Sequence, residues 1–141
     1  MKSEFCNIAK VENRFWLSRE EYVGGPRLGL LPPEELTKDM PLGELGARVI
    51  LALDAFFNAG RKLRPLDWER HEAEAATFYN VKNSRVLRAK IRNFTIRRTG
   101  LEICFFNGKT GLQFMDINYV DDFSLGQKVL QAIEDTFRSI R

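Results

Sequence analysis

The sequence predicts an α+β fold in which an antiparallel β-sheet is packed by two similar amphipathic helices. Residues 45–57 read LGARVILALDAFF and residues 125–137 read LGQKVLQAIEDTF, and nine of these thirteen aligned positions are identical or closely similar. Between the two segments, residues 91–120 hold three apolar stretches joined by short turns that contain glycine. Short connections of this kind are typical of neighbouring antiparallel strands.

With 141 residues, the chain is expected to form a single domain, 1–141. Hydrophobic residues make up 44% and charged residues 29%, so a core can form without disulfides or a structural metal. Two cysteines, Cys6 and Cys104, allow one disulfide, but buried free thiols are the favoured interpretation. Because the N-terminus lacks the apolar segment of a signal peptide and no apolar run reaches about 18 residues, we expect a cytoplasmic protein without a membrane span.

The first half of the chain predicts one short strand, a loop and a helix. The aromatic run at 13–18 (NRFWLS) favours a strand, and the glycines and prolines of 24–35 favour a loop. The first copy of the repeated phrase predicts a helix at about 43–58, since its apolar residues recur at helical spacing. Asn58-Ala59-Gly60 is expected to end this helix, with Gly60 in a left-handed conformation.

A middle helix is expected at about 67–78, with Asp67 as its cap. The following segment, 80–90, fits either a helical turn or the entry into a strand. The second copy of the phrase predicts a final helix at about 125–139, where Ser124 and Gln127 have the spacing of a capping box.

Two explanations of the repeated phrase remain open. Any two helices that pack on one sheet need similar apolar faces, so the similarity can be coincidental. Alternatively, the chain holds two strand–turn–helix units laid on one sheet. Two copies are too few for a repeat array.

The segment Asn107-Gly108-Lys109-Thr110 contains the GKT of a phosphate loop, but it is better explained as a hairpin turn. The phosphate-loop motif needs a glycine five positions before Gly108, where Ile103 stands. The segment also lies between two predicted strands, whereas a phosphate loop precedes a helix.

No other residues form a convincing catalytic or metal-binding set. His71 has acidic neighbours, yet the chain has no second histidine, so we expect an ordinary helix residue. Asp116, Asp121 and Asp122 could bind a divalent ion, but an acidic turn before a helix N-terminus is the favoured explanation. The sequence therefore predicts a protein that is not an enzyme and uses no cofactor or metal.

Charge is distributed unevenly along the chain. The net charge is +3, yet no acidic residue occurs between Ala75 and Leu101, which hold seven lysines and arginines. Arg85, Arg88 and Arg92, with Tyr79 and Phe94 interleaved, could contact phosphates and bases or form a protein interface. A solvated sheet face is the third explanation of this basic run.

The two copies of the phrase, each after an acidic turn, and the segment FYNVKNSRVLRAKIRNFTIRRTGLEICFFNG resemble one family of immunity proteins of bacterial contact-dependent growth inhibition (CDI) systems. The resemblance spans about residues 28–137 and rests on structural motifs. It implies a bacterial cytoplasmic protein, without enzymatic activity, that tightly binds the toxic C-terminal domain of a surface-delivered effector, often a nuclease. The alternative function is an RNA- or DNA-binding module that uses the basic run 82–98.

Two surfaces are candidates for contact with such a toxin. The acidic segments at 34–39 and 116–122 would suit the basic cleft of a nuclease. The basic run would instead dock on an acidic patch or on acidic catalytic residues. We favour the basic run, and the predicted partner-binding residues are Tyr79, Lys82, Arg85, Arg88 and Arg92.

Overall fold

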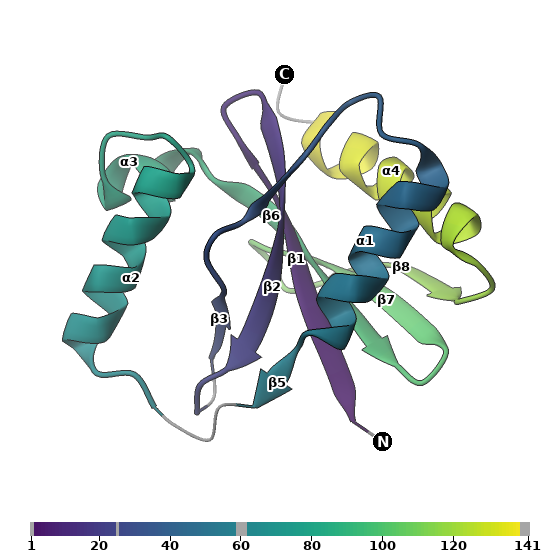
Figure 1. Ribbon diagram of the computed structural model, residues 1–141, viewed down its shortest axis with the longest axis horizontal. Coiled ribbons are helices and arrows are strands. Elements are labelled where there is room, and N and C mark those ends of the chain that lie inside the picture. The colour runs from purple at the N-terminus through teal and green to yellow at the C-terminus, as the bar shows by residue number, and fades with distance from the viewer. Residues whose placement is uncertain (1, 25, 59–61, 139–141) are drawn as a thin grey trace.

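A computed structural model describes residues 2–24, 26–58 and 62–138 of the chain (Figure 1). The fold is α+β, as predicted: within these residues, eight strands form one sheet and four helices pack on its two faces. The elements are β1 (Ser3–Val11), β2 (Arg14–Tyr22), β3 (Arg27–Gly29), β4 (Glu34–Leu36), α1 (Leu42–Asp54), β5 (Phe57–Asn58), α2 (Pro65–Phe78), α3 (Ser84–Lys90), β6 (Arg92–Thr99), β7 (Glu102–Asn107), β8 (Gln113–Asn118) and α4 (Asp122–Arg138).

The main path of the sheet runs β3-β2-β1-β6-β7-β8, and β4 and β5 each pair with β2. All pairings are antiparallel except that of β5 with β2, which is parallel. The predicted strands at 91–120 are confirmed as β6, β7 and β8. The N-terminal hairpin contributes more than the single short strand that we expected, because β1 and β2 are nine residues each and β1 pairs with β6 in the centre of the sheet.

Helices α1 and α4 lie together on one face of the sheet (Figure 1). Their apolar stripes form the main core with residues of β1 and β6 such as Ile8 and Phe94, which are 0% exposed. The two helices approach each other closely at glycines. A Cβ atom at Gly46 would lie 1.8 Å from the carbonyl oxygen of Asp122, and a Cβ at Gly126 would lie 1.9 Å from that of Leu42.

This reciprocal contact gives the repeated phrase a structural reason. Each helix carries Leu-Gly at the point where it meets the first turn of the other, followed by an apolar stripe that faces the same sheet. The strands that precede the two helices differ, since three-residue β4 pairs with β2 whereas β8 lies at the far edge. The similarity therefore comes from the helix pair and not from two equivalent strand–turn–helix units.

The end of the first helix differs from the prediction of 43–58. Helix α1 ends at Asp54, and Phe57 and Asn58 form β5 beside β2. Phe57 consequently lies 47% exposed, although the repeated phrase aligns it with buried Phe137. The other two residues of the predicted stop, 59 and 60, lie outside the described residues, as does position 139 of the predicted final helix.

Two helix caps also differ from the predictions. Helix α2 begins at Pro65 with Arg64 as its cap, and Asp67 accepts a hydrogen bond from the Arg64 amide at 3.0 Å. Asp121 precedes α4 and accepts from the Ser124 amide at 2.7 Å, so Ser124 lies inside the first turn and the predicted capping box is wrong. In both places a carboxylate satisfies a first-turn amide that has no partner inside the helix.

Helices α2 and α3 lie on the opposite face of the sheet and build a second, smaller core (Figure 1). The undecided segment at 80–90 contains α3, which Asn83 caps by accepting from the Val86 amide at 2.9 Å. The second core holds Val11, Trp16, Ala75, Ala76, Tyr79 and Leu87. Among the described helices, none is both long and apolar enough to cross a membrane. Cys6 and Cys104 are buried free thiols, as expected.

Candidate functional site

A cleft of about 700 Å³ separates part of the second face of the sheet from α2 and α3. Ala75, Tyr79 and Leu87 of the small second core line part of this space. Beyond that core, the strands present polar side chains, which cannot pack against an apolar helix face without losing their hydration. These polar side chains therefore prevent close packing of the two helices on this part of the sheet. The resulting concavity is the candidate site, which we call the main cleft.

Strand register arranges the floor of the main cleft in rows that cross the sheet. Asn7 of β1 pairs with Ser18 of β2 on one side and with Thr95 of β6 on the other, and Thr95 pairs with Phe106 of β7. Ser18 is 4% exposed and Thr95 8%. These hydroxyls occupy central positions that an apolar side chain would normally fill in a covered sheet.

Hydrogen bonds satisfy several of these polar groups. The side-chain NH₂ group of Asn93 donates to the Asn7 side-chain carbonyl at 2.7 Å. The hydroxyls of Ser18 and Tyr79 are 3.2 Å apart and share a hydrogen bond. The ring of Tyr79 meets Trp16 edge-on with ring centroids 5.4 Å apart. These contacts within the chain hold the side chains of the floor in place.

The main cleft also contains the carboxyl group of Glu20 and the guanidinium groups of Arg27 and Arg97. Glu20 is 7% exposed and lies 3.4 Å from the Arg27 guanidinium. Burial raises the pKa of the Glu20 carboxyl, and the nearby Arg27 partly opposes this effect. Arg27 stacks over Phe5 with 4.1 Å between the guanidinium carbon and the ring centroid, and Arg97 stacks over Phe106 with 4.8 Å.

His71 lies on the α2 wall of the main cleft. Burial lowers the pKa of its imidazole, while the carboxylates of Glu74 and Glu72 act in the opposite direction. A hydrogen bond with the Gly29 backbone also opposes the effect of burial, and the net result is a lowered pKa of His71.

The structure divides the predicted partner-binding residues into three groups. Tyr79 is 8% exposed and belongs to the second core and the wall of the main cleft, so it does not lie on the surface beside the arginines. Arg88 is exposed and forms an ion pair with Glu72 at 2.5 Å. Lys82, Arg85 and Arg92 are exposed and form no ion pair within the described part of the chain.

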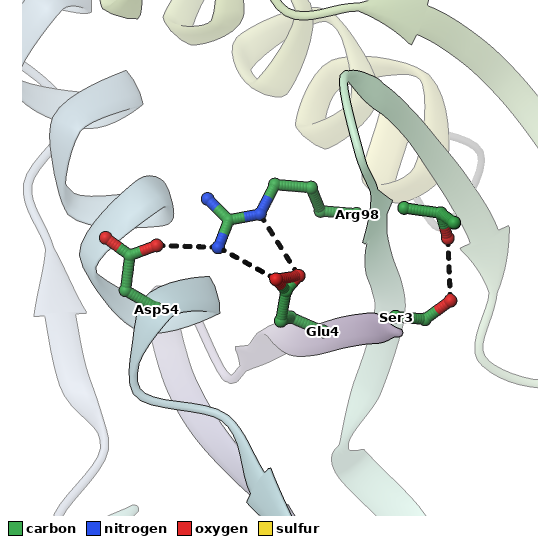
Figure 2. A network of polar contacts seen from close by, with 5 residues as sticks. Ser3, Glu4, Asp54 and Arg98 are labelled. Carbon is green, nitrogen blue, oxygen red and sulfur yellow. Dashed lines mark hydrogen bonds and ion pairs between the residues drawn. The ribbon is translucent and has the colours of Figure 1, made fainter. Parts of the chain in front are cut away.

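Arg98, also part of the basic run, holds the fold together. Figure 2 shows its guanidinium between Glu4 of β1 and Asp54 at the end of α1, with N–O distances of 3.2 Å to Glu4 and 2.6 Å to Asp54. Burial lowers the pKa of Arg98, but hydrogen bonds to these two carboxylates outweigh it and leave a net increase. The run 82–98 is thus partly a set of structural ion pairs and partly a free basic surface.

The hairpin interpretation of residues 107–110 is confirmed. The Asn107 side-chain carbonyl accepts hydrogen bonds from the amides of Lys109 at 2.8 Å and Thr110 at 3.0 Å. The Gly108 amide donates to the carbonyl of Asn93 at 3.0 Å. The amides that a phosphate loop would aim at a ligand are therefore engaged inside the turn.

The predicted acidic turn belongs to the start of α4. Asp121 caps the helix, and Asp122 accepts from the Tyr119 hydroxyl at 2.7 Å. In the described residues, Glu102, Cys104 and Asp116 bring three possible metal-ligand atoms within 4.8 Å of one another. However, the Arg97 guanidinium contacts the Cys104 sulfur at 3.7 Å, so a cation already faces this thiol.

Sequence reasoning missed the residues that define the main cleft: Asn7, Ser18, Glu20, Asn93, Thr95 and Arg97. Their signal was an alternation of polar and apolar residues along β2 and β6, which is equally typical of a strand with one solvated face. The difference is that α2 and α3 cover this polar face, and their position on the sheet is known only from the structure.

Comparison with family models and with curated proteins finds no match. Two solved structures share the fold over nearly the whole chain. A protein of unknown function from Neisseria meningitidis matches with a TM-score of 0.68 and 14% identity, covering 95% of each chain. A chain of the CdiA-CT/CdiI toxin and immunity complex from Yersinia pseudotuberculosis matches with a TM-score of 0.66 and 10% identity, covering 95% of this chain and 97% of that one. At these identities, the likeness is one of fold.

Proposed function

We propose that this protein is an immunity protein, which binds the C-terminal toxin domain of a CDI effector and neutralises it. The observation that carries the proposal is the fold shared, over 95% of this chain, with a chain of a toxin and immunity complex. The neutralised domain is proposed to be a nuclease, as the family resemblance implies. Neutralisation is proposed to occur by binding alone, in the bacterial cytoplasm, without a cofactor or a metal.

The surface beside the main cleft supports this proposal. Lys82, Arg85 and Arg92 lie on or near α3 and have no ion-pair partner in the described residues, so their charge is available to a partner. Arg88 is exposed beside them, but its charge is paired with that of Glu72. Unpaired cations accelerate encounter with an acidic surface, and the preformed floor of the cleft reduces the ordering cost of binding. We assign the toxin-binding surface to this side.

Co-expression tests the proposed function. The C-terminal toxin domain of the effector that we expect to be encoded directly upstream is induced in cells with or without this chain, and survival is scored. We expect survival only when the chain is present. A toxin domain from an unrelated effector serves as the specificity control and should kill in both cases. Death of cells that contain the folded chain together with this toxin domain would contradict the proposal.

A further inference from the structure

A second cleft, of about 520 Å³, opens beside the main cleft. It lies where the end of α3 and the start of β6 meet the β7–β8 turn and α4. Arg88 comes from α3 and Arg92 from the start of β6, and Lys109 and Thr110 come from the β7–β8 turn. Among the described residues, no aspartate or glutamate lines this second cleft, whereas Glu20 lines the main cleft. The charged side chains in this lining, Arg88, Arg92 and Lys109, are therefore all cations.

The charges of the second cleft are mostly uncompensated. Arg92 and Lys109 are exposed and form no ion pair within the described residues, and Arg88 is held in place by Glu72 at 2.5 Å. Cations gathered in one concavity repel one another and focus a positive potential in it. An anion bound there would relieve that repulsion.

Neutral hydrogen-bond donors accompany the cations. The Thr110 oxygen accepts from the Leu112 amide at 3.2 Å, which leaves its hydroxyl proton to donate. The Asn107 side-chain carbonyl is occupied by the amides of Lys109 and Thr110, which leaves its NH₂ group to donate. The lining thus offers a hydroxyl donor and an NH₂ donor, while the Asn107 side-chain carbonyl is already occupied as an acceptor.

We propose that this second cleft binds a ligand that carries a phosphoryl group, as found on a nucleotide or a nucleic-acid strand. A guanidinium group can pair with two phosphate oxygens at once, and the ammonium and hydroxyl donors suit the remaining oxygens. Because the backbone amides of the turn are engaged internally, side chains and not a phosphate loop make the recognition. This inference shares Arg88 and Arg92 with the proposed toxin-binding surface, but it concerns the isolated chain and its test needs no toxin.

Nuclear magnetic resonance titration tests the inference on the full chain labelled with ¹⁵N. The probes are inorganic phosphate, AMP and a short single-stranded RNA, each at low salt. We expect saturable shifts at the amides of Arg92, Lys109 and Thr110. The double variant Arg92→Ala/Lys109→Ala should weaken AMP binding about tenfold or more, because it removes two charge-assisted contacts. The control Lys38→Ala/Lys128→Ala removes equal charge from residues that line neither cleft and should change affinity by less than roughly twofold.

The same titrations distinguish a single nucleotide from a nucleic-acid strand as the ligand. RNA that binds more tightly than AMP, with an affinity that falls steeply as salt increases, would assign the site to a nucleic-acid strand. Equal affinity for AMP and RNA would assign it to a single nucleotide. Unchanged AMP affinity in the Arg92→Ala/Lys109→Ala variant overturns the inference. An equal loss in the two double variants also overturns it, because attraction to net charge would then explain the binding.

Discussion

Glu20 places a carboxylate in the enclosed part of the main cleft, where it is 7% exposed and has Arg27 as its charged neighbour at 3.4 Å. A buried carboxylate is costly unless it is paired, and here the pairing leaves its pKa raised. A neutral residue of the same shape would serve the fold at lower cost. Groups of this kind occur disproportionately at binding sites, which is consistent with a cleft that receives a partner.

The Glu20→Gln variant should change how stability depends on pH. Since the folded pKa of Glu20 is raised, its contribution to the unfolding free energy is fully present below the unfolded pKa of about 4.5 and is lost as pH rises through the folded pKa. The unfolding free energy of the wild type minus that of the variant should therefore fall from pH 4 to pH 8. Urea unfolding measures this difference. The contribution of His71 is the same in both proteins and cancels when the two unfolding free energies are subtracted. A difference that rises with pH would mean that attraction to Arg27 dominates.

Arg98 should be important for stability. Replacing it by Met leaves the carboxylates of Glu4 and Asp54 without their shared cation (Figure 2). We expect a loss of about 1–2 kcal/mol in the unfolding free energy, because the guanidinium is mostly buried between partners that remain partly hydrated. The matched variant Arg85→Met alters an exposed residue and should cost less than about 0.5 kcal/mol. Equal losses in the two variants would contradict the structural role of Arg98.

At the level of elements, the pairing of α1 with α4 depends on backbone contact at two glycines. Gly46 and Gly126 each lie against a main-chain carbonyl of the other helix, and a main-chain atom cannot move aside as a flexible side chain can. The Leu-Gly pair therefore occurs twice in the sequence because each helix needs a glycine at the same close crossing.

Alanine substitutions at these glycines should be strongly destabilising. In an exposed helix, Gly→Ala usually stabilises by about 0.5–1 kcal/mol. At Gly46 or Gly126, the added Cβ would overlap a carbonyl oxygen, so we expect a loss of about 2–3 kcal/mol or more. Gly43 is the matched control on α1, because a Cβ there meets nothing within 4 Å, and Gly43→Ala should be neutral or stabilising. Thermal or urea unfolding of the three variants decides this, and similar stabilities would exclude a close crossing.

Sequence reasoning predicted best the elements with a strong internal period. The stripes of α1 and α4 and the alternation in β6–β8 are explicit in the residues, and the structure confirms these elements. Strand β1 was missed because Asn7 and Lys10 interrupt its apolar pattern, although Cys6 and Ile8 face the main core. Helix ends were displaced because Asp67 and Asp121 cap from positions other than those expected.

For the whole molecule, the two faces of the sheet have different roles. One face is apolar and closed by α1 and α4, and the other carries polar residues under α2 and α3. The floor of the main cleft joins Asn7, Ser18 and Thr95, which lie far apart in the sequence and meet only through strand pairing. The basic run could be seen in the sequence, but which of its charges are free depends on ion pairs that only the fold creates.

The free cations should control the rate of toxin association. Reversing three of them, in Lys82→Glu/Arg85→Glu/Arg92→Glu, should lower the association rate constant by about tenfold or more at low salt, with a smaller effect on dissociation. The control Lys2→Glu/Lys38→Glu/Lys128→Glu makes the same change in net charge on other surfaces. Surface plasmon resonance compares the variants, and equal association rates would remove the basic surface from the interface.

The most direct test of the central claim is calorimetric titration of this chain with the purified C-terminal toxin domain of the effector that we expect to be encoded upstream, at two salt concentrations. We predict a one-to-one complex with a dissociation constant near or below roughly 1 nM, about −12 kcal/mol, that keeps most of its affinity at the higher salt. The absence of heat at micromolar concentrations, with both proteins folded, would contradict the proposed immunity function and leave the likeness to the toxin and immunity complex as a shared fold.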